Sequence, residues 1–291
     1  MSNNLVLVGF GYMARRIADK LKNDGLQSDR KVFSLSRSAQ IQPAWLEHIS
    51  WDLDQPATGN FPHSLIFDYS SILYLAPPPS TGKTDPRMAN FLSLIEQSAS
   101  LPAKIILIST TGVYGNCDGA WVDESFAVQP EVARAYRRAS AEKQLQEFCS
   151  KQSISCTILR VSGIYAKDKL PLERIKKQLP VVDKASSPYS NRIHAQDLTN
   201  ICCQALEEDH VGVFNCSDCD PTTMTDYFMR LAENFHLAKP PIISMQQAHE
   251  QLSPGMFSYM QESRRISNKK LLTEFQMELR YPSLSSFLDS L

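Results

Sequence analysis

Short apolar segments alternate along this chain with longer amphipathic ones, and this alternation restricts the fold more than any other feature of the sequence. The apolar segments have the length of strands and the amphipathic ones the spacing of helices. In chain order they are Leu5–Val8, Tyr12–Lys22, Lys31–Leu35, Ser71–Leu75, Arg87–Ser98, Lys104–Ile108, Glu131–Cys149, Cys156–Val161, Gln196–Glu207 and Gly212–Cys216. Continuous apolar strands between helices are typical of a parallel sheet covered on both faces. We therefore predict an α/β fold with a doubly wound parallel sheet.

The alternation weakens after Val161, where prolines break the chain into short pieces. These prolines are Pro171, Pro180, Pro188, Pro221, Pro240, Pro241 and Pro254. We predict that residues 1–165 form the sheet domain and that 194–216 return to it. A smaller lobe, which would bind the substrate, is expected from 166–193 and 217–291.

The composition excludes several classes of partner. The chain has 291 residues, and its 30 Lys and Arg against 31 Asp and Glu give a formal net charge of −1. A general basic surface for nucleic acid or anionic lipid is therefore not expected. The apolar segments are much shorter than the roughly 20 residues that span a bilayer. We predict neither a nucleic-acid nor a membrane partner, and we leave a homodimer open.

The first residues and the cysteines indicate a reducing compartment. Residues 1–10 contain neither a basic segment nor a small-residue cleavage site ahead of the first strand. The 7 cysteines are scattered through a large chain, and an odd number cannot all pair internally. We predict a cytoplasmic protein with reduced thiols. Cys216 and Cys219 form a lone CxxC without a second pair or a suitably spaced His, so no metal site is expected.

The segment after the first strand matches a turn that binds phosphate. Gly9-Phe10-Gly11-Tyr12-Met13-Ala14 reads GxGxxA between the apolar strand and the next helix. Gly9 permits a tight turn, Gly11 lets the backbone approach a pyrophosphate, and Ala14 allows close helix packing. We predict that Gly9, Gly11, Tyr12, Met13 and Ala14 hold the pyrophosphate at the helix N-terminus. The alternative is a strand-to-helix turn that binds nothing.

The end of the second strand bears on cofactor choice. It reads Ser36-Arg37-Ser38, with Arg37 where an NAD-selective fold usually has an acidic residue for the ribose 2′-hydroxyl. A guanidinium accommodates a 2′-phosphate, so Arg37 favours NADP, although NAD stays open. The alternative is a solvated surface arginine.

Two further segments are expected at the same site. Ile49–Leu53 reads as a third strand whose final Asp52 and Leu53 are suited to flank an adenine ring. Asp52 is equally compatible with a turn. Ala76 and Pro77 begin a loop after the fourth strand, at the sheet edge where such folds bind ligands. We predict that they line the cofactor site.

Several motifs stand in a characteristic order along nearly the whole chain. They are Gly9–Ala14, Asp52-Leu53, Ile108–Gly115, Leu159–Tyr165, Asn191–Leu198, Gly212–Asp218 and Ile266–Leu271. In this order they resemble the extended short-chain dehydrogenase/reductase superfamily, in its NAD-dependent epimerase/dehydratase group. The resemblance implies a Rossmann domain that binds a dinucleotide and a smaller C-terminal lobe that binds substrate.

The resemblance also implies how catalysis would work. In that family a Ser or Thr at the end of the fifth strand polarises the substrate oxygen, and the Tyr of a YxxxK helix is the acid/base. The Lys lowers the pKa of that Tyr and holds the nicotinamide ribose. Counting back from Tyr114, the family hydroxyl falls on Thr110. The alternative is a strand-end hydroxyl that bonds to local backbone.

The candidate helix departs from the family at the catalytic positions. When Glu142 is aligned with the family Glu, Arg134 stands at the Tyr position and Arg138 at the Lys position. An arginine does not serve readily as an acid/base, but Arg138 could replace the Lys as a cofactor contact. Tyr136 is the nearest phenol, and Thr110 with Tyr136 is our candidate catalytic pair. A solvated basic face is the alternative for the arginines.

This pattern resembles the atypical members of the superfamily, which keep the cofactor site and lose the Tyr/Lys pair. It predicts an NAD(P)-binding oxidoreductase or epimerase-like protein. The substrate would be a small molecule with a hydroxyl or carbonyl group, and a nucleotide sugar is one candidate by analogy of fold. The alternative is an NAD(P)-binding regulatory or sensor protein without dehydrogenase turnover.

Overall fold

The computed structural model describes residues 4–26, 30–37, 43–56, 61, 64–98 and 100–291. Ser38 of the predicted cofactor turn lies outside these ranges. The chain divides into two compact units. The first comprises Met1–Val113, Ala133–Arg160 and Leu198–Phe214, and the second Tyr114–Val132, Val161–Asp197 and Asn215–Leu291.

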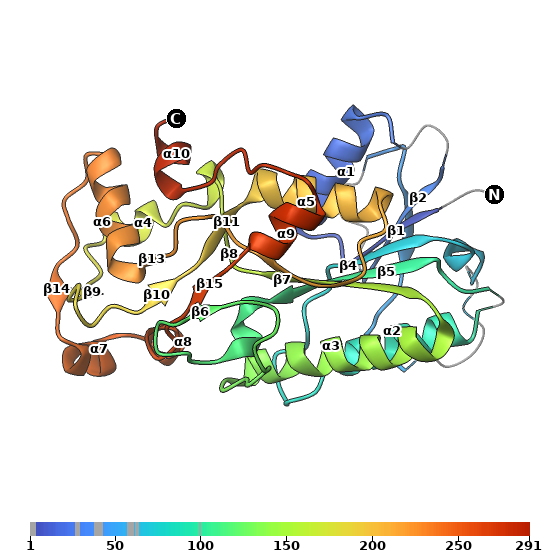
Figure 1. The fold of residues 1–291 in the computed structure, drawn as a ribbon, viewed down its shortest axis with the longest axis horizontal. Coiled ribbons are helices and arrows are strands. Elements are labelled where there is room, and N and C mark those ends of the chain that lie inside the picture. The colour runs from blue at the N-terminus through green and yellow to red at the C-terminus, as the bar shows by residue number, and fades with distance from the viewer. Residues whose placement is uncertain (1–3, 27–29, 38–42, 57–60, 62–63, 99) are drawn as a thin grey trace. The chain divides into compact units, whose positions relative to one another are not determined.

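A seven-stranded sheet in the order β12-β7-β5-β4-β1-β2-β3 organises the first unit (Figure 1). The strands are β1 (Leu5–Val8), β2 (Val32–Ser36), β3 (Glu47–Ser50), β4 (Ser71–Tyr74), β5 (Lys104–Thr110), β7 (Ser155–Val161) and β12 (Gly212–Cys216). β1 pairs in parallel with both β2 and β4, and the pairs β2–β3 and β4–β5 are also parallel. Every residue of β1 and of β4 is buried, as expected for strands covered on both faces. The predicted doubly wound α/β fold is confirmed.

Helices connect these strands. They are α1 (Tyr12–Asn23), α2 (Pro86–Glu96), α3 (Ala133–Gln152) and α5 (Ala195–Glu207), with a short 3₁₀ turn at Ser64–Phe67. α1 buries residues at helical spacing, among them Ala14, Ile17 and Leu21. α2 begins with Asp85, whose carboxylate accepts the N–H of Met88. α2 and α3 run side by side (Figure 1) and pack on a core that includes residues of β1, β4 and β5.

The third strand ends earlier than predicted. β3 is Glu47–Ser50, and its pairing with β2 ends where Ser36 faces Ser50. The predicted strand through Leu53 is therefore wrong at its end. The carboxylate of Asp52 accepts the N–H of Asp54 at 3.0 Å, which turns the chain away from the sheet.

The second unit contains short two-stranded ladders and short helices. Its strands are β6 (Trp121–Val122), β8 (Gly163–Tyr165), β9 (Val181–Val182), β10 (Tyr189–Ser190), β11 (Arg192–His194), β13 (Thr222–Thr223), β14 (Ile242–Ile243) and β15 (Arg265–Ile266). Its helices are α4 (Leu172–Lys176), α6 (Met224–Asn234), α7 (Met245–Gln251), α8 (Pro254–Met260), α9 (Lys269–Glu274) and α10 (Leu284–Leu288). One apolar cluster, which includes Tyr165, Phe228, Leu231 and Phe287, joins α4, α6 and α10.

The division differs from the predicted one at Tyr114–Val132. We expected this segment in the sheet domain, but the structure groups it with the second unit. The physical reason is the parallel pairing of β6 with β15, a strand more than a hundred residues further along the chain. The second unit also takes 161–165, 194–197 and 215–216, at the ends of the predicted ranges. None of the described helices combines the length and the apolar character needed to cross a membrane.

Candidate functional site

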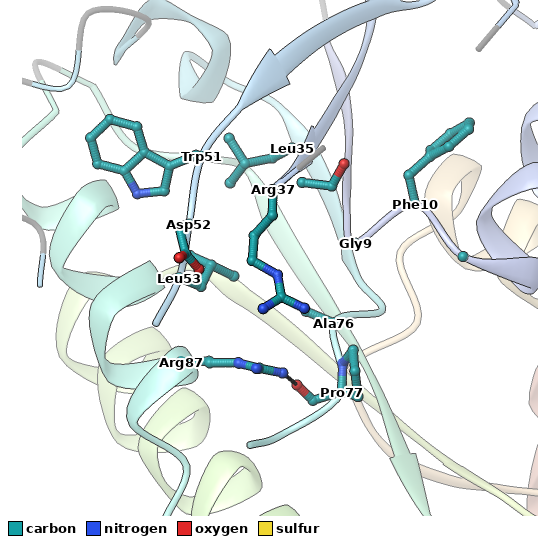
Figure 2. Close-up of a pocket in the computed structure, with 12 residues that line it drawn as sticks. Gly9, Phe10, Leu35, Arg37, Trp51, Asp52, Leu53, Ala76, Pro77 and Arg87 are labelled. Atoms are coloured by element: carbon teal, nitrogen blue, oxygen red, sulfur yellow. Dashed lines mark hydrogen bonds between the residues drawn. The ribbon is translucent and has the colours of Figure 1, made fainter. Parts of the chain in front are cut away.

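A cavity of about 220 Å³ opens in the first unit at the carboxyl ends of β1, β2 and β4 (Figure 2). It is lined by Gly9, Phe10, Gly11, Leu35, Ser36, Arg37, Trp51, Asp52, Leu53, Ala76, Pro77 and Arg87. β1 lies between β2 and β4, so the direction of strand addition reverses here. Doubly wound sheets bind their ligands at this kind of reversal.

The two glycines of the predicted phosphate turn lie in different surroundings. Gly9 has a φ of 89°, and a Cβ there would stand 2.7 Å from the backbone nitrogen of Ala76. Packing against the loop after β4 therefore requires glycine at this position. A Cβ at Gly11 would meet nothing within 4 Å. Gly11 thus leaves room for a ligand to approach the backbone.

The N-terminus of α1 faces this turn without a side-chain cap. Gly11 is the N-cap residue, and the first helical turn contains no acidic residue. The N–H groups and the helix dipole therefore favour an anion here. Met13 and Ala14 are buried and Tyr12 packs with Arg16, whose guanidinium carbon is 5.6 Å from the ring centroid. Any contact from Met13 or Ala14 to a phosphate would therefore come from the backbone.

The opposite end of the cavity consists of residues that follow β2 and β3. Leu53 is buried, and its carbonyl accepts a hydrogen bond from Asn90 of α2 at 2.9 Å. Asp52 lines the cavity while its carboxylate holds the turn to Asp54. Arg37 also lines it, with a side chain that is 64% exposed and a guanidinium 3.3 Å from Asp54. The structure thus brings Arg37, Asp52 and Leu53 together with Gly9 and Gly11.

Sequence reasoning missed Arg87 and Asp54. Arg87 donates from Nε and Nη2 to the two carboxylate oxygens of Asp54 at 2.5 and 2.8 Å, and from Nη1 to the Pro77 carbonyl at 2.8 Å. The hydrogen bond from Arg87 lowers the pKa of Asp54 and raises that of Arg87. Asp85-Pro86, a capped helix start after the fourth strand, was the signal that could have placed Arg87 at this edge.

Arg138 does not line the cavity but bonds to Ala76, which does. Its Nη2 donates to the carbonyl of Ala76 at 3.1 Å. Its Nη1 is buried and has no hydrogen-bond partner in the described part of the chain. Burial lowers the pKa of Arg138, against the opposing charges of Asp85 and Tyr74. The neighbouring Arg137 donates to the carbonyl of Gly82 at 2.9 Å, so α3 holds the loop after β4 at two points.

The candidate catalytic side chains make local contacts. Thr110 Oγ1 accepts the N–H of Gly112 at 3.2 Å. This is the contact expected if Thr110 is a strand-end hydroxyl that bonds to local backbone. The Tyr136 ring lies 5.0 Å from the ammonium of Lys83 and is 36% exposed. No hydrogen bond between described residues joins Thr110 to Tyr136, and neither lines the cavity. Within the described ranges no cluster of His, Cys, Asp and Glu is arranged to hold a metal ion.

No family model matches this sequence, and no curated protein matches it. Solved structures match over nearly the whole length. A functionally unknown conserved protein from Silicibacter pomeroyi DSS is 25% identical, with a TM-score of 0.80, covering 99% of this chain and 98% of the other.

Two further solved structures have names that indicate a function. A Methylobacillus flagellatus protein, provisionally named an NAD-dependent epimerase/dehydratase, is 23% identical with a TM-score of 0.72. The match covers 100% of this chain and 97% of the other. UDP-glucuronic acid 4-epimerase from Bacillus cereus, solved in complex with NAD, is 19% identical with a TM-score of 0.72. The match covers 98% of this chain and 96% of the other. At these identities the likeness shows a shared fold.

Proposed function

We propose that this chain, which has the fold of the NAD-dependent epimerases and dehydratases of the extended short-chain dehydrogenase/reductase superfamily, binds a nicotinamide dinucleotide in the first unit. The observation that carries the proposal is the open space at Gly11, beside the uncapped N-terminus of α1. A pyrophosphate needs both features, because its oxygens must approach the backbone N–H groups. The Bacillus cereus epimerase that shares the fold was solved with NAD, which supports the same class of ligand.

The lining of the cavity suits the adenosine half of this ligand. Asp52 and Leu53 would flank the adenine, and Ala76 and Pro77 would form the wall beside the ribose. Arg37 reaches the cavity from the end of β2, where the ribose 2′ position lies in this fold. We therefore take NADP as the preferred cofactor.

When bound, the nicotinamide ring would accept or donate a hydride. For an oxidoreductase or epimerase-like reaction, Thr110 would polarise a hydroxyl or carbonyl oxygen of the substrate and Tyr136 would exchange the proton. Arg138, bonded to Ala76, would keep the loop wall in position. A nucleotide sugar is the substrate class we favour, because the Bacillus cereus neighbour is named for a UDP-sugar.

A second candidate function is cofactor binding without dehydrogenase turnover. Arg134 and Arg138 occupy the positions at which the family has its Tyr and Lys. Thr110 bonds to the backbone of Gly112, and Tyr136 lies against Lys83. These contacts favour a protein that binds its cofactor without dehydrogenase turnover, and such a protein would act by regulating a partner.

Thermal unfolding of the full chain with NADP or NAD at matched concentrations tests the binding proposal. A ligand that binds only the folded state stabilises it by about 2.7 kcal/mol at a hundredfold excess over Kd. We expect NADP to raise the melting temperature more than NAD, and Arg37→Ala to remove most of that difference. Lys143→Ala, on the exposed side of α3, is the matched loss of one positive charge. If neither nucleotide shifts the transition, the cofactor assignment fails.

Turnover is tested separately, with a panel of hydroxyl- and carbonyl-bearing substrates and absorbance of the reduced nicotinamide. If an activity is found, Thr110→Ala and Tyr136→Phe should each lower kcat by about 100-fold or more, as expected for loss of a proton-transfer group. Binding of NADP without any turnover would favour the second candidate function.

A further inference from the structure

A second arginine lines the cavity beside Arg37. Arg87 comes from the first turn of α2, whereas Arg37 follows β2, and Figure 2 shows both side chains reaching toward Ala76 and Pro77. The Arg87 side chain is 15% exposed, compared with 64% for Arg37. The cofactor residues assigned above do not include this largely enclosed guanidinium.

Arg87 is held in one orientation. It forms a bidentate pair with Asp54 and a third bond to the Pro77 carbonyl. A guanidinium has five N–H donors. Within the described part of the chain, one N–H on each terminal nitrogen of Arg87 is left for another acceptor. The group is therefore fixed and still able to donate.

Asp54 binds the two arginines unequally. Both of its oxygens are engaged by Arg87, while Arg37 makes a single contact at 3.3 Å. The hydrogen bond from Arg87 lowers the pKa of Asp54, so the carboxylate stays ionised near neutral pH. Arg37, Arg87 and Asp54 together carry a net charge of +1, and Asp52, which also lines this side of the cavity, brings the formal charge there to zero. The preference for a phosphate therefore depends on the directed N–H donors of the two guanidinium groups rather than on net charge. Arg37, more exposed and weakly tied, can turn to meet a ligand.

We propose that Arg87 is a second specificity-determining residue, which acts with Arg37 to select a phosphate monoester on the adenosine ribose. Asp54 acts as a positioning residue that holds the Arg87 fork. This inference rests on the proposed function. A 2′-phosphate carries a charge of about −1.5 to −2 and offers three acceptor oxygens, whereas a 2′-hydroxyl is neutral. A fixed guanidinium loses little side-chain entropy on binding, so it discriminates between the two more strongly than a mobile one.

The test is the dissociation constant of NADP and of NAD, measured by calorimetry on the full chain. We expect Arg87→Ala to weaken NADP by about 10- to 100-fold, the range for lost hydrogen bonds to a charged group, and to change NAD by less than about threefold. Arg87→Lys keeps the charge without the fork and should give a smaller loss of NADP. Lys143→Ala should leave both constants unchanged.

The Asp54→Asn variant distinguishes two roles for Asp54: holding Arg87 in place for a 2′-phosphate, or accepting a hydrogen bond from a ribose 2′-hydroxyl. If Asp54 holds the Arg87 fork, the variant loosens it and reduces the preference for NADP over NAD, while NAD binding itself stays intact. If instead Asp54 accepts a hydrogen bond from a ribose 2′-hydroxyl, the variant loses NAD selectively, and the inference is overturned.

Two further outcomes distinguish the role of Arg87 from the proposed binding of a nicotinamide dinucleotide. Equal weakening of NADP and NAD by Arg87→Ala would make Arg87 a wall residue and overturn the inference while cofactor binding stands. Wild-type protein that binds neither nucleotide would overturn the proposed function itself. Unfolding of each variant without ligand identifies any that lose the fold, and for these Arg87→Lys provides the decisive comparison.

Discussion

Single residues at the turn after β1 separate packing from binding. Gly9 adopts a left-handed φ against the backbone of Ala76, while Gly11 borders open space. We expect Gly9→Ala to lower the free energy of unfolding by about 2–4 kcal/mol, from strain and the clash with Ala76. Gly11→Ala should leave stability within about 1 kcal/mol and weaken dinucleotide binding. Urea unfolding and ligand titration of both variants check this, and a stability loss confined to Gly11→Ala would contradict it.

A buried carboxyl group in the second unit predicts a pH dependence. Asp218 is 2% exposed, and burial raises its pKa to about 8, against the nearby charge of Arg192. The folded state then keeps a proton that the unfolded chain, with a pKa near 3.8, releases. Stability is therefore unaffected below about pH 4, falls between pH 4 and 8, and is constant again above pH 8 with respect to this group.

The Asp218→Asn variant isolates this effect. Its stability relative to wild type should rise from pH 5 to pH 8, by at most about 1.4 kcal/mol per pH unit. Chemical unfolding across this range measures the difference, and Asp24→Asn, at an exposed ion pair with Lys20 in the first unit, serves as the control. A difference that does not change with pH would mean that Asp218 stays ionised beside Arg192.

A buried ion pair between Glu142 and Arg160 connects helix α3 to the sheet. Glu142 of α3 accepts hydrogen bonds from Arg160 of β7, at 2.7 Å from Nη2, and from Ser109 of β5. The side chains of Arg160 and Glu142 are 6% and 4% exposed. Glu142 thus connects α3 to two strands of the sheet, β5 and β7.

Breaking this pair on one side should be costly. We expect Glu142→Gln to destabilise the protein by about 3–5 kcal/mol, because it removes the carboxylate charge that is paired with the buried Arg160. The double variant Glu142→Gln with Arg160→Met should recover part of that loss. Denaturant unfolding of the single and double variants gives the coupling energy, and strictly additive losses would count against the ion pair as the cause.

The same helix shows why its arginines differ from a solvated basic face. Arg137 and Arg138 donate to the carbonyls of Gly82 and Ala76, so they hold the loop between β4 and α2. The sequence placed Arg138 on the helix face that meets the cofactor in the family. In the structure Arg138 bonds to Ala76, a lining residue, and does not line the cavity itself. A direct contact between Arg138 and the cofactor stays a prediction.

For the molecule as a whole, the sequence by itself determined the class of fold and the place of the candidate site. Strand and helix formation depend on the spacing of apolar residues a few positions apart, so β1, α1, β2, β4 and the later elements could be read directly. The GxGxxA turn is local as well, because its geometry needs only Gly9 and Gly11 in their order after a strand. The ends of elements, such as that of β3, were less well determined.

Only the tertiary structure decided which distant residues meet. Asp54 and Arg87 are 33 positions apart and pair because the chain that follows β3 meets the start of α2. Tyr114–Val132 belongs to the second unit because β6 pairs with β15. Such contacts depend on the order of strands and the path of the connections, which no local periodicity encodes. The motif therefore located the cavity, whereas the charge arrangement proposed to select its ligand emerged only from the fold.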